Sequence, residues 1–201
     1  MIGIVDYGVG NLRNVQKAVE RLGGEAQISS SANVLHSSDA IILPGVGAFG
    51  DAAGKLASSG LKEFVDEWVE SGKLLLGICV GMQLLFDVSY EFGECKGLGY
   101  LQGAVVPFPA GALKVPHIGW NQLEGVADSP LLEGVHNGDY VYFVHSFYAE
   151  PIEEDLLAYT EYGVKAAACV GKGNVYGTQF HPEKSAGVGS KILSNFLEMA
   201  K

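Results

Sequence analysis

The residue type and spacing most suited to chemistry surround Cys79, in the segment Gly77-Ile78-Cys79-Val80-Gly81. An apolar run over residues 74–76 precedes this segment, and an apolar pattern of helical spacing follows it. A glycine two residues to each side of a nucleophile is typical of a sharp strand-to-helix turn, because the turn needs strained dihedral angles and leaves no room for side chains. The sulfur is then expected at a helix N-terminus, where the dipole favours a thiolate. Such a thiolate would attack a carbonyl carbon.

A cysteine nucleophile needs a base, and the base needs a group that orients it. His181 and Glu183 stand two residues apart, just after an apolar strand and on either side of Pro182. In an extended segment, residues two apart point the same way, so both side chains could enter one site. A carboxylate on one imidazole nitrogen would leave the other nitrogen to face the sulfur. The spacing is compatible with a Cys79–His181–Glu183 triad, although sequence alone does not place His181 beside Cys79.

Attack on a carbonyl also requires donors for the developing oxyanion. The backbone N–H of Val80, next to the nucleophile, is one expected donor, and the turn Gly45-Val46-Gly47 is expected to supply a second. Gln83 stands four residues after Cys79, which on a helix is the same face one turn further on. Its amide is therefore predicted to hydrogen-bond a polar substrate.

These residues must be positioned by elements that the apolar periodicity predicts. In the first half, strands are predicted over residues 3–6, 26–28, 40–43 and 74–78, and helices over 11–22, 51–57 and 61–70, with a further helix starting over 81–86. Pro44 is expected to stop the third of these strands. In the second half, strands are predicted over 105–106, 121–123, 140–147, 156–160, 165–170 and 175–179, followed by a helix that starts at residue 185 or 186 and ends at 199.

The order of these elements predicts an α/β fold with a central, mostly parallel sheet. Apolar strands that alternate with amphipathic helices indicate a sheet covered on both faces, and the later strands indicate an antiparallel extension. A length of 201 residues fits a single domain over residues 1–201.

Composition excludes several classes of function. The net charge is −10, and no basic patch with interleaved aromatics is present, so nucleic-acid binding is not expected. No basic leader precedes the first apolar run, and no apolar stretch reaches the ~20 residues of a membrane helix. Cys79, Cys95 and Cys169 are odd in number and have no framework spacing. Free thiols in a reducing, cytoplasmic compartment are therefore expected.

Other residues have competing interpretations. Residues 45–50 fit G-x-G-x-x-G after a strand, but Pro44 opens the turn and no acidic strand end follows, so a dinucleotide site is disfavoured. No Cys or His pair has metal-ligand spacing, and neither a metal nor a cofactor is predicted. Cys95 and Cys169 are interpreted as structural. His117 and His145 lie in polar–aromatic clusters that are either core or the rim of a binding site.

Taken together, the segments 77–83 and 180–183 resemble the class I, or triad, glutamine amidotransferases. Four further segments are similar to one group within that class, the glutaminase subunits of imidazole glycerol phosphate synthases. These segments are residues 6–12, 43–49, 116–121 and 142–148. The resemblance runs from Ile2 to the final helix. It implies the amidotransferase variant of the α/β fold, hydrolysis of glutamine to glutamate and ammonia, and passage of the ammonia to a (β/α)8-barrel cyclase subunit in histidine biosynthesis.

The resemblance also implies roles for individual residues. Cys79 would be the nucleophile, His181 the acid and base, and Glu183 its orienting group. Further roles would fall to two sets of residues. Gly47, Gln83, Glu91, Ser146 and Phe147 match positions that contact glutamine, and Asn11, Trp120, Tyr142 and Lys184 match positions at the subunit interface and the ammonia route.

Two residues depart from the family pattern. Val9 stands where many members have proline, and Phe147 stands where tyrosine is common, so no hydroxyl is available there. The glutaminase of another amidotransferase, such as that of pyridoxal phosphate synthase, is an alternative that the Trp120 segment disfavours. A catalytically idle regulator or chaperone with a cysteine elbow is another, and labelling of Cys79 by a glutamine-mimicking electrophile would distinguish it.

Overall fold

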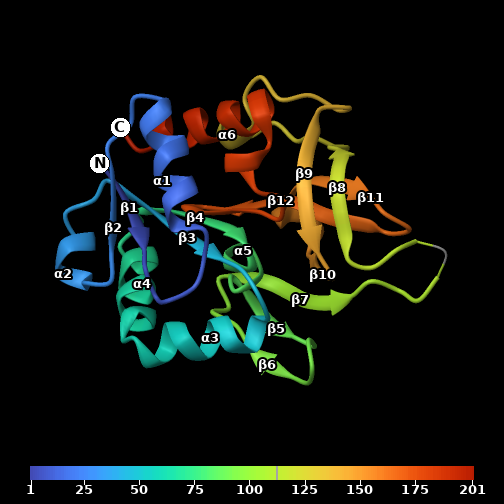
Figure 1. Ribbon diagram of the computed structural model, residues 1–201, viewed down its shortest axis with the longest axis horizontal. Coiled ribbons are helices and arrows are strands. Elements are labelled where there is room, and N and C mark those ends of the chain that lie inside the picture. Colours follow the sequence, from blue (N-terminus) through green and yellow to red (C-terminus); the bar gives the residue numbers. More distant parts are fainter. Residues whose placement is uncertain (112) are drawn as a thin grey trace.

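The central feature of the protein is a mostly parallel sheet, in which the carboxyl ends of neighbouring parallel strands lie at the same edge (Figure 1). A computed structural model describes residues 1–111 and 113–201, and within them seven strands form this sheet in the order β11-β12-β13-β4-β3-β1-β2. Its strands are β1 (Ile2–Val5), β2 (Ala26–Ser29), β3 (Ala40–Gly45), β4 (Leu74–Cys79), β11 (Leu156–Glu161), β12 (Lys165–Lys172) and β13 (Val175–Thr178). From β2 to β13 all neighbours are parallel, whereas β12 and β11 are added antiparallel. The predicted fold class and its antiparallel extension are confirmed.

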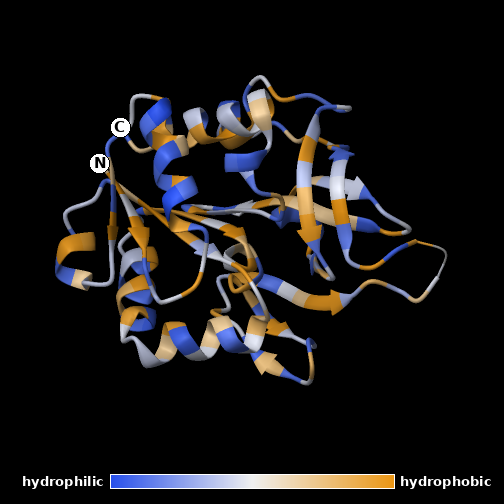
Figure 2. Cartoon of the chain, in the orientation of Figure 1, coloured by the Kyte–Doolittle hydropathy of each residue, from blue (hydrophilic) through white to orange (hydrophobic). Residues whose placement is uncertain are grey.

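Helices cover both faces of the parallel strands. In Figure 1, α1 (Leu12–Arg21) and α6 (Ala186–Met199) lie on one face, and α3 (Phe49–Ser58) and α4 (Leu61–Glu70) lie on the other. The short helix α2 (Ala32–Leu35), which the sequence pattern did not predict, contacts the edge strand β2 and its neighbour β1. Because both faces are covered, every residue of β3 is buried, and the strands form an apolar band through the molecule (Figure 2).

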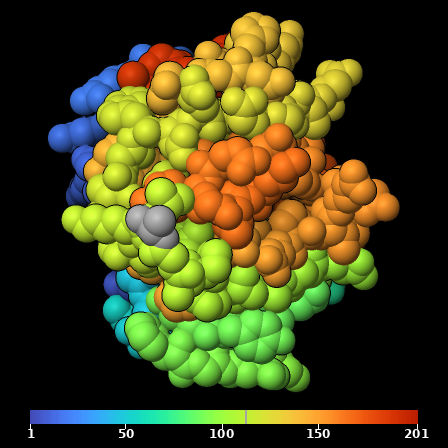
Figure 3. Space-filling view, turned by 90° about the vertical axis from the view of Figure 1, so that its right-hand side faces the viewer, coloured from blue at the N-terminus to red at the C-terminus, as the bar shows by residue number. Residues whose placement is uncertain are grey.

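Two smaller groups of strands flank the end of the sheet. One has the order β10-β7-β5-β6, with β5 (Phe86–Ser89), β6 (Cys95–Lys96), β7 (Leu101–Pro107) and β10 (Phe147–Pro151). In the other, β8 (His117–Gln122) pairs antiparallel with β9 (Tyr140–His145). Figure 3 views this side of the molecule, where the β11–β12 hairpin (orange) lies against the yellow-green segments that contain β7 and β8.

The structure corrects three predictions of local structure. Pro44 does not stop its strand, because β3 continues to Gly45, and Pro44 opposes Ile78 in the parallel pairing with β4. The helix expected over 81–86 is only one turn, α5 (Val80–Gln83), and Phe86 already begins β5. The strand expected over 140–147 is interrupted at Ser146, so that β9 and β10 belong to different sheets.

The remaining short elements are 3₁₀ turns: η1 (Pro130–Leu132), η2 (Glu153–Asp155) and η3 (Pro182–Lys184). Among residues 1–111 and 113–201, no helix combines the length and apolar character needed to cross a bilayer.

Candidate active site

Strand order brings the candidate catalytic residues to one edge of the sheet. β4 lies between β3 and β13, and in register Cys79 opposes Gly45 while Ile78 opposes Thr178. The carboxyl ends of parallel strands share an edge, which is where such sheets bind ligands. The chain therefore continues from the three strand ends into Gly47, Cys79 and His181. This adjacency of β4 and β13 is the link that the sequence pattern left open.

Cys79 occupies a strained turn between β4 and α5. Its φ is 57° and its ψ is −113°, a conformation that non-glycine residues rarely adopt. The flanking glycines are required by close backbone contacts: a Cβ on Gly81 would lie 1.8 Å from the Leu43 carbonyl oxygen, and one on Gly77 would lie 2.6 Å from the Gly81 carbonyl oxygen. The predicted strained turn is confirmed.

Because α5 has a single turn, its dipole gives little support to a thiolate. Besides His181, the sulfur has two hydrogen-bonding neighbours. The Cys79 thiol donates to the Val144 carbonyl oxygen at 3.9 Å, and the side-chain amide of Gln179 donates to the sulfur at 3.8 Å. The chemistry of the sulfur therefore depends on individual hydrogen bonds from neighbouring strands.

His181 and Glu183 form a buried pair. Nδ1 of His181 lies 2.9 Å from Oε1 of Glu183, and the side chains are 3% and 1% exposed. They meet across the 3₁₀ turn η3, which Pro182 begins, and not by the alternation of an extended strand. The backbone also fixes His181, whose N–H donates to the Tyr142 carbonyl oxygen and whose carbonyl accepts from the Ser185 hydroxyl.

The charge state of His181 follows from its neighbours. Burial alone would lower its pKa, but hydrogen bonds and charge interactions with Cys79 and Glu183 outweigh burial and raise the pKa to about 9. The carboxylate of Glu183 accepts a hydrogen bond from the Nδ1–H group, which leaves Nε2 for proton exchange with a reacting group.

A cavity of about 270 Å³ opens in front of Cys79 and His181. Its walls include the other residues that the sequence assigned to the oxyanion hole and to the substrate, namely Gly47, Val80, Gln83, Glu91, Ser146 and Phe147. Gly47 has φ +87°, a conformation that suits glycine, and it follows the end of β3. The structure thus gathers residues that are far apart in the chain around one small cavity.

Hydrogen bonds fix two of these substrate candidates. Glu91 accepts from the backbone N–H of Phe49 at 2.6 Å, at the start of α3. Gln83 is 3% exposed, and its Nε2 donates to the Phe147 carbonyl oxygen and to Oε1 of Gln179. Phe147 therefore takes part through its main chain, so the absence of a tyrosine hydroxyl does not affect this contact.

The candidate interface residues lie outside the cavity lining. Trp120 on β8 and Tyr142 on β9 are register partners whose rings are 5.9 Å apart, and Trp120 is 52% exposed. Lys184 is exposed in η3, and Asn11 is half-buried just before α1.

His117 and His145 are core residues, with one of them at the cavity wall. They are 3% and 7% exposed, and Nδ1 of His117 lies 2.9 Å from Nε2 of His145, which lines the cavity. Nδ1 of His145 must donate to the Phe147 carbonyl oxygen, so its Nε2 accepts from His117. Burial lowers the pKa of His117 to about 4 and that of His145 to about 3, so both are neutral at pH 7.

Sequence reasoning missed two residues that contact the site. The hydroxyl of buried Tyr7 donates to the Pro44 carbonyl oxygen at 2.7 Å, and so anchors the start of the turn that contains Gly47. Gln179 is fully buried beside the sulfur. The available signal was a polar residue at the end of an apolar strand, immediately before Phe180 and His181.

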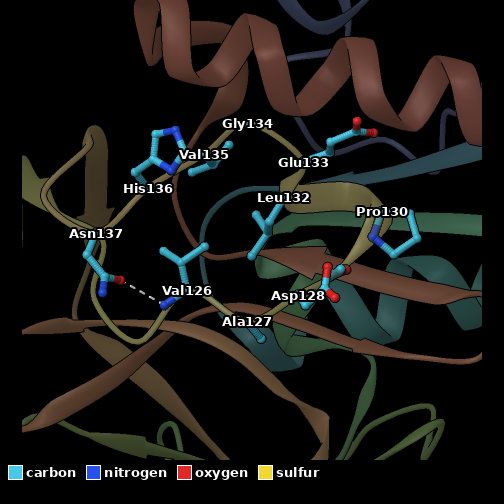
Figure 4. Close-up of a pocket in the computed structure, with 11 residues that line it drawn as sticks. Val126, Ala127, Asp128, Pro130, Leu132, Glu133, Gly134, Val135, His136 and Asn137 are labelled. Atoms are coloured by element: carbon cyan, nitrogen blue, oxygen red, sulfur yellow. Dashed lines mark hydrogen bonds between the residues drawn. The ribbon is translucent and has the colours of Figure 1, made fainter.

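A second hollow, of about 720 Å³, lies within the loop between β8 and β9 (Figure 4). The loop curves around it, and the N–H of Val126 donates to Oδ1 of Asn137 across it. It shares no lining residue with the cavity at Cys79 and contains no cysteine. Within the described residues, no group of three His, Cys, Asp or Glu side chains is arranged to hold a metal ion.

The comparisons with known proteins agree with this geometry. The family model "Glutamine amidotransferase class-I" matches residues 3–200, and the chain therefore belongs to the class I glutamine amidotransferases. Its relatives include the "Imidazole glycerol phosphate synthase subunit HisH" of Caldanaerobacter subterraneus subsp. tengcongensis, 52% identical over 202 residues that cover 100% of this chain and 99% of the relative. The protein of the same name from Bacillus subtilis is 51% identical over 206 residues, covering 100% and 97%.

Solved structures also match over nearly the whole chain. A structure described as "Crystal structure of glutamine amidotransferase" has a TM-score of 0.78 at 25% identity and covers 99% of this chain and 98% of its own. The structure of PurLQS from Thermotoga maritima has a TM-score of 0.76 at 24% identity, covers 100% and 98%, and supports the fold alone.

Proposed function

We propose that this chain is the glutaminase subunit of imidazole glycerol phosphate synthase, acting in the cytoplasm. It hydrolyses glutamine to glutamate and ammonia and passes the ammonia to a (β/α)8-barrel cyclase subunit, which makes imidazole glycerol phosphate and an aminoimidazole carboxamide ribotide in histidine biosynthesis. The observation that carries the proposal is Cys79 beside His181–Glu183 at one cavity, in a chain about half identical to the subunits named above. A family match over residues 3–200 supports one amidotransferase domain over residues 1–201.

The first chemical step is attack by Cys79 on the side-chain amide of glutamine. The thiolate forms a bond to the amide carbon, and the carbonyl oxygen becomes an oxyanion. The backbone N–H of Val80 and a donor near Gly47 would stabilise that oxygen, at ~3 kcal/mol for each donor, and both residues line the cavity. The strained turn holds the sulfur at the cavity, so little reorganisation precedes attack.

His181 then moves the protons. With a pKa of about 9 its imidazole is protonated at neutral pH and can donate to the departing ammonia, which leaves a thioester on Cys79. The neutral imidazole then takes a proton from water, and the resulting hydroxide releases glutamate. Glu183 keeps the ring oriented through both steps. Every step uses groups of this chain.

A partner subunit is required because ammonia released into water would be protonated and lost. The outer face of β8 and β9 suits a partner, since Ile118, Trp120 and Tyr140 are each more than half exposed. Large exposed apolar side chains in one place are typical of protein interfaces. Trp120, Tyr142, Lys184 and Asn11 are assigned to this interface and to the ammonia route in a heterodimer.

The proposal is tested by co-purifying the chain with a candidate cyclase subunit and measuring glutamine hydrolysis with and without the cyclase ligand. We expect a complex whose glutaminase activity is stimulated by that ligand. Cys79→Ala should abolish glutaminase activity, because no thioester can form, while the ammonia-dependent reaction of the partner remains.

Two results would contradict the assignment. An assembled complex without ligand-stimulated glutamine hydrolysis would exclude this glutaminase function. Loss of the ammonia-dependent reaction in a Cys79→Ala complex that still assembles would show that Cys79 does not act only in glutamine hydrolysis.

A further inference from the structure

One polar side chain next to Cys79 has no place in the triad or in the oxyanion hole. Gln179 follows β13, has an exposed fraction of 0%, and makes both of its hydrogen bonds within the site. Its Nε2 lies 3.8 Å from the sulfur of Cys79, and its Oε1 lies 2.9 Å from Nε2 of Gln83. Burying an uncharged amide is costly unless its polar atoms are paired, so this position is adapted to the two partners.

We propose that Gln179 is a catalytic residue whose side-chain N–H donates to the thiolate of Cys79. The oxygen of the same carboxamide also fixes the orientation of Gln83, so that Gln83 presents only its Oε1, a hydrogen-bond acceptor, to the substrate amide. This assignment rests on the proposed glutaminase function for its substrate and extends it to a residue outside the triad.

The direction of each hydrogen bond follows from the chemistry of the groups. Nε2 of Gln83 donates both of its protons, one to the Phe147 carbonyl oxygen and one to Oε1 of Gln179. Because Oε1 of Gln179 accepts, its NH₂ group is the one that faces the sulfur. The Phe147 carbonyl oxygen is an acceptor only, so Gln83 cannot turn its amide around without leaving two acceptors opposed.

The sulfur therefore has neighbours that favour different charge states. The Val144 carbonyl oxygen accepts the proton of the neutral thiol, and this bond is lost on ionisation. The N–H of Gln179 donates to the sulfur, and a donor is bound more strongly by an anion than by a neutral thiol. Loss of the Gln179 donor should therefore make Cys79 harder to ionise. His181 and Tyr7 also interact with this thiol, and the titratable residues His145 and Glu91 line the same cavity; all four remain in the variants below.

The orientation of Gln83 has a consequence for selectivity. Its Oε1 accepts no hydrogen bond from the described residues. This oxygen is not among the buried atoms without a partner, and the residue lines the cavity. An oxygen in this position accepts from the NH₂ group of a glutamine side chain. Glutamate presents only carboxylate oxygens, which this acceptor repels. Gln179 would therefore help the site to bind the substrate amide and to release the product acid.

Two substitutions separate these two effects. In Gln179→Glu the carboxylate still accepts from Gln83 but cannot donate to the sulfur, whereas Gln179→Met removes both bonds at similar length. We expect alkylation of Cys79 by iodoacetamide to require a higher pH in both variants, and more so in Gln179→Glu, because its carboxylate also adds a like charge beside the thiolate; Gln179→Met therefore reports the lost donor by itself. Mass spectrometry of the Cys79 peptide distinguishes this reaction from labelling at Cys95 and Cys169.

Inhibition by glutamate provides the second measurement, in the complex with the cyclase subunit. The quantity to compare is the inhibition constant for glutamate divided by the KM for glutamine. In Gln179→Met this ratio should be several-fold lower than in the wild type, because Gln83 can then rotate. In Gln179→Glu it should equal the wild-type ratio. The exposed residue Gln27 on β2 offers matched controls. Gln27→Glu and Gln27→Met should change neither quantity.

A wild-type measurement covers the case in which a substitution prevents folding. By NMR, the side-chain amide protons of Gln179 should shift as Cys79 ionises, and this titration should be absent in Cys79→Ala. A folded Gln179→Met whose alkylation profile superimposes on the wild type, or wild-type amide protons that do not respond to the thiol, would overturn the proposal. Failure of the glutaminase function itself would instead appear as a wild-type complex without glutamine hydrolysis.

Discussion

At the scale of single residues, the site depends on pairs that are buried together. The carboxylate of Glu183 is 1% exposed and is paired with the imidazole of His181. Without that carboxylate, burial would lower the pKa of the imidazole against the interaction with Cys79 alone. The protonated His181, which donates to the departing ammonia, therefore depends on its pairing with Glu183.

Glu183→Gln tests this dependence. We expect the pKa of His181 to fall from about 9, because only the interaction with Cys79 then opposes burial, and kcat to fall by about a hundredfold or more because the proton donor is depleted and the ring is no longer oriented. NMR titration of the His181 ring and a pH–rate profile would measure the two effects. Glu153→Gln, at an exposed position in η2, is the matched control. An unchanged His181 titration in a folded Glu183→Gln chain would contradict this account.

At the scale of elements, the sequence predicted the strands and helices that have strong periodicity. Helix α4 (Leu61–Glu70) has the predicted bounds, and β1, β4 and β13 are within one or two residues of them. The errors lie where tertiary contacts override local preference. Pro44 remains in a strand because its neighbours pair and its carbonyl accepts from Tyr7, and the segment after Gln83 leaves the helix to form β5.

Gly81→Ala tests how tightly the elbow between β4 and α5 is packed against β3. The added Cβ would lie 1.8 Å from the Leu43 carbonyl oxygen, and backbone cannot move aside as a side chain can. We expect the free energy of unfolding to fall by roughly 1–3 kcal/mol or more and glutaminase activity to be lost as the Cys79 turn shifts.

Gly54→Ala, in the middle of α3, is the control for that substitution. A Cβ there meets nothing within 4 Å, and alanine is the better helix former, so stability should rise by ~0.5–1 kcal/mol. Urea unfolding measures both variants. Equal stabilities for Gly81→Ala and the wild type would show that β3 and α5 can separate without cost.

At the scale of the whole molecule, catalytic residues far apart in sequence meet because of strand order. Cys79 and His181 are brought together only because β13 returns beside β4, and a pattern of local periodicity does not specify which strands are neighbours. Family resemblance supplied that information at the sequence level. It supplied nothing for Gln179, whose contacts with sulfur and with Gln83 exist only once β4, α5 and β13 are assembled.

The buried imidazoles also make overall stability depend on pH in two opposite senses. The folded pKa of His181 is raised to about 9, so its stabilising contribution is complete below the unfolded value of about 6.5 and is lost as pH rises from there through 9. The folded pKa values of His117 and His145 are lowered to about 4 and about 3. As pH falls below about 6.5, the unfolded chain binds protons that these folded imidazoles do not, and stability decreases.

His117→Phe isolates the acidic side of this dependence. Phenylalanine can keep the stacking of His117 on Phe143 and Tyr162 but cannot donate to His145. The variant should be less stable than the wild type at pH 7 because that hydrogen bond is lost. Between pH 6.5 and 4, however, the stability of the variant should fall less steeply than that of the wild type, because one fewer neutral imidazole is buried. The two slopes should differ by about 1.4 kcal/mol per pH unit. Urea unfolding at several pH values measures both slopes, and parallel curves would mean that His117 is protonated in the folded protein.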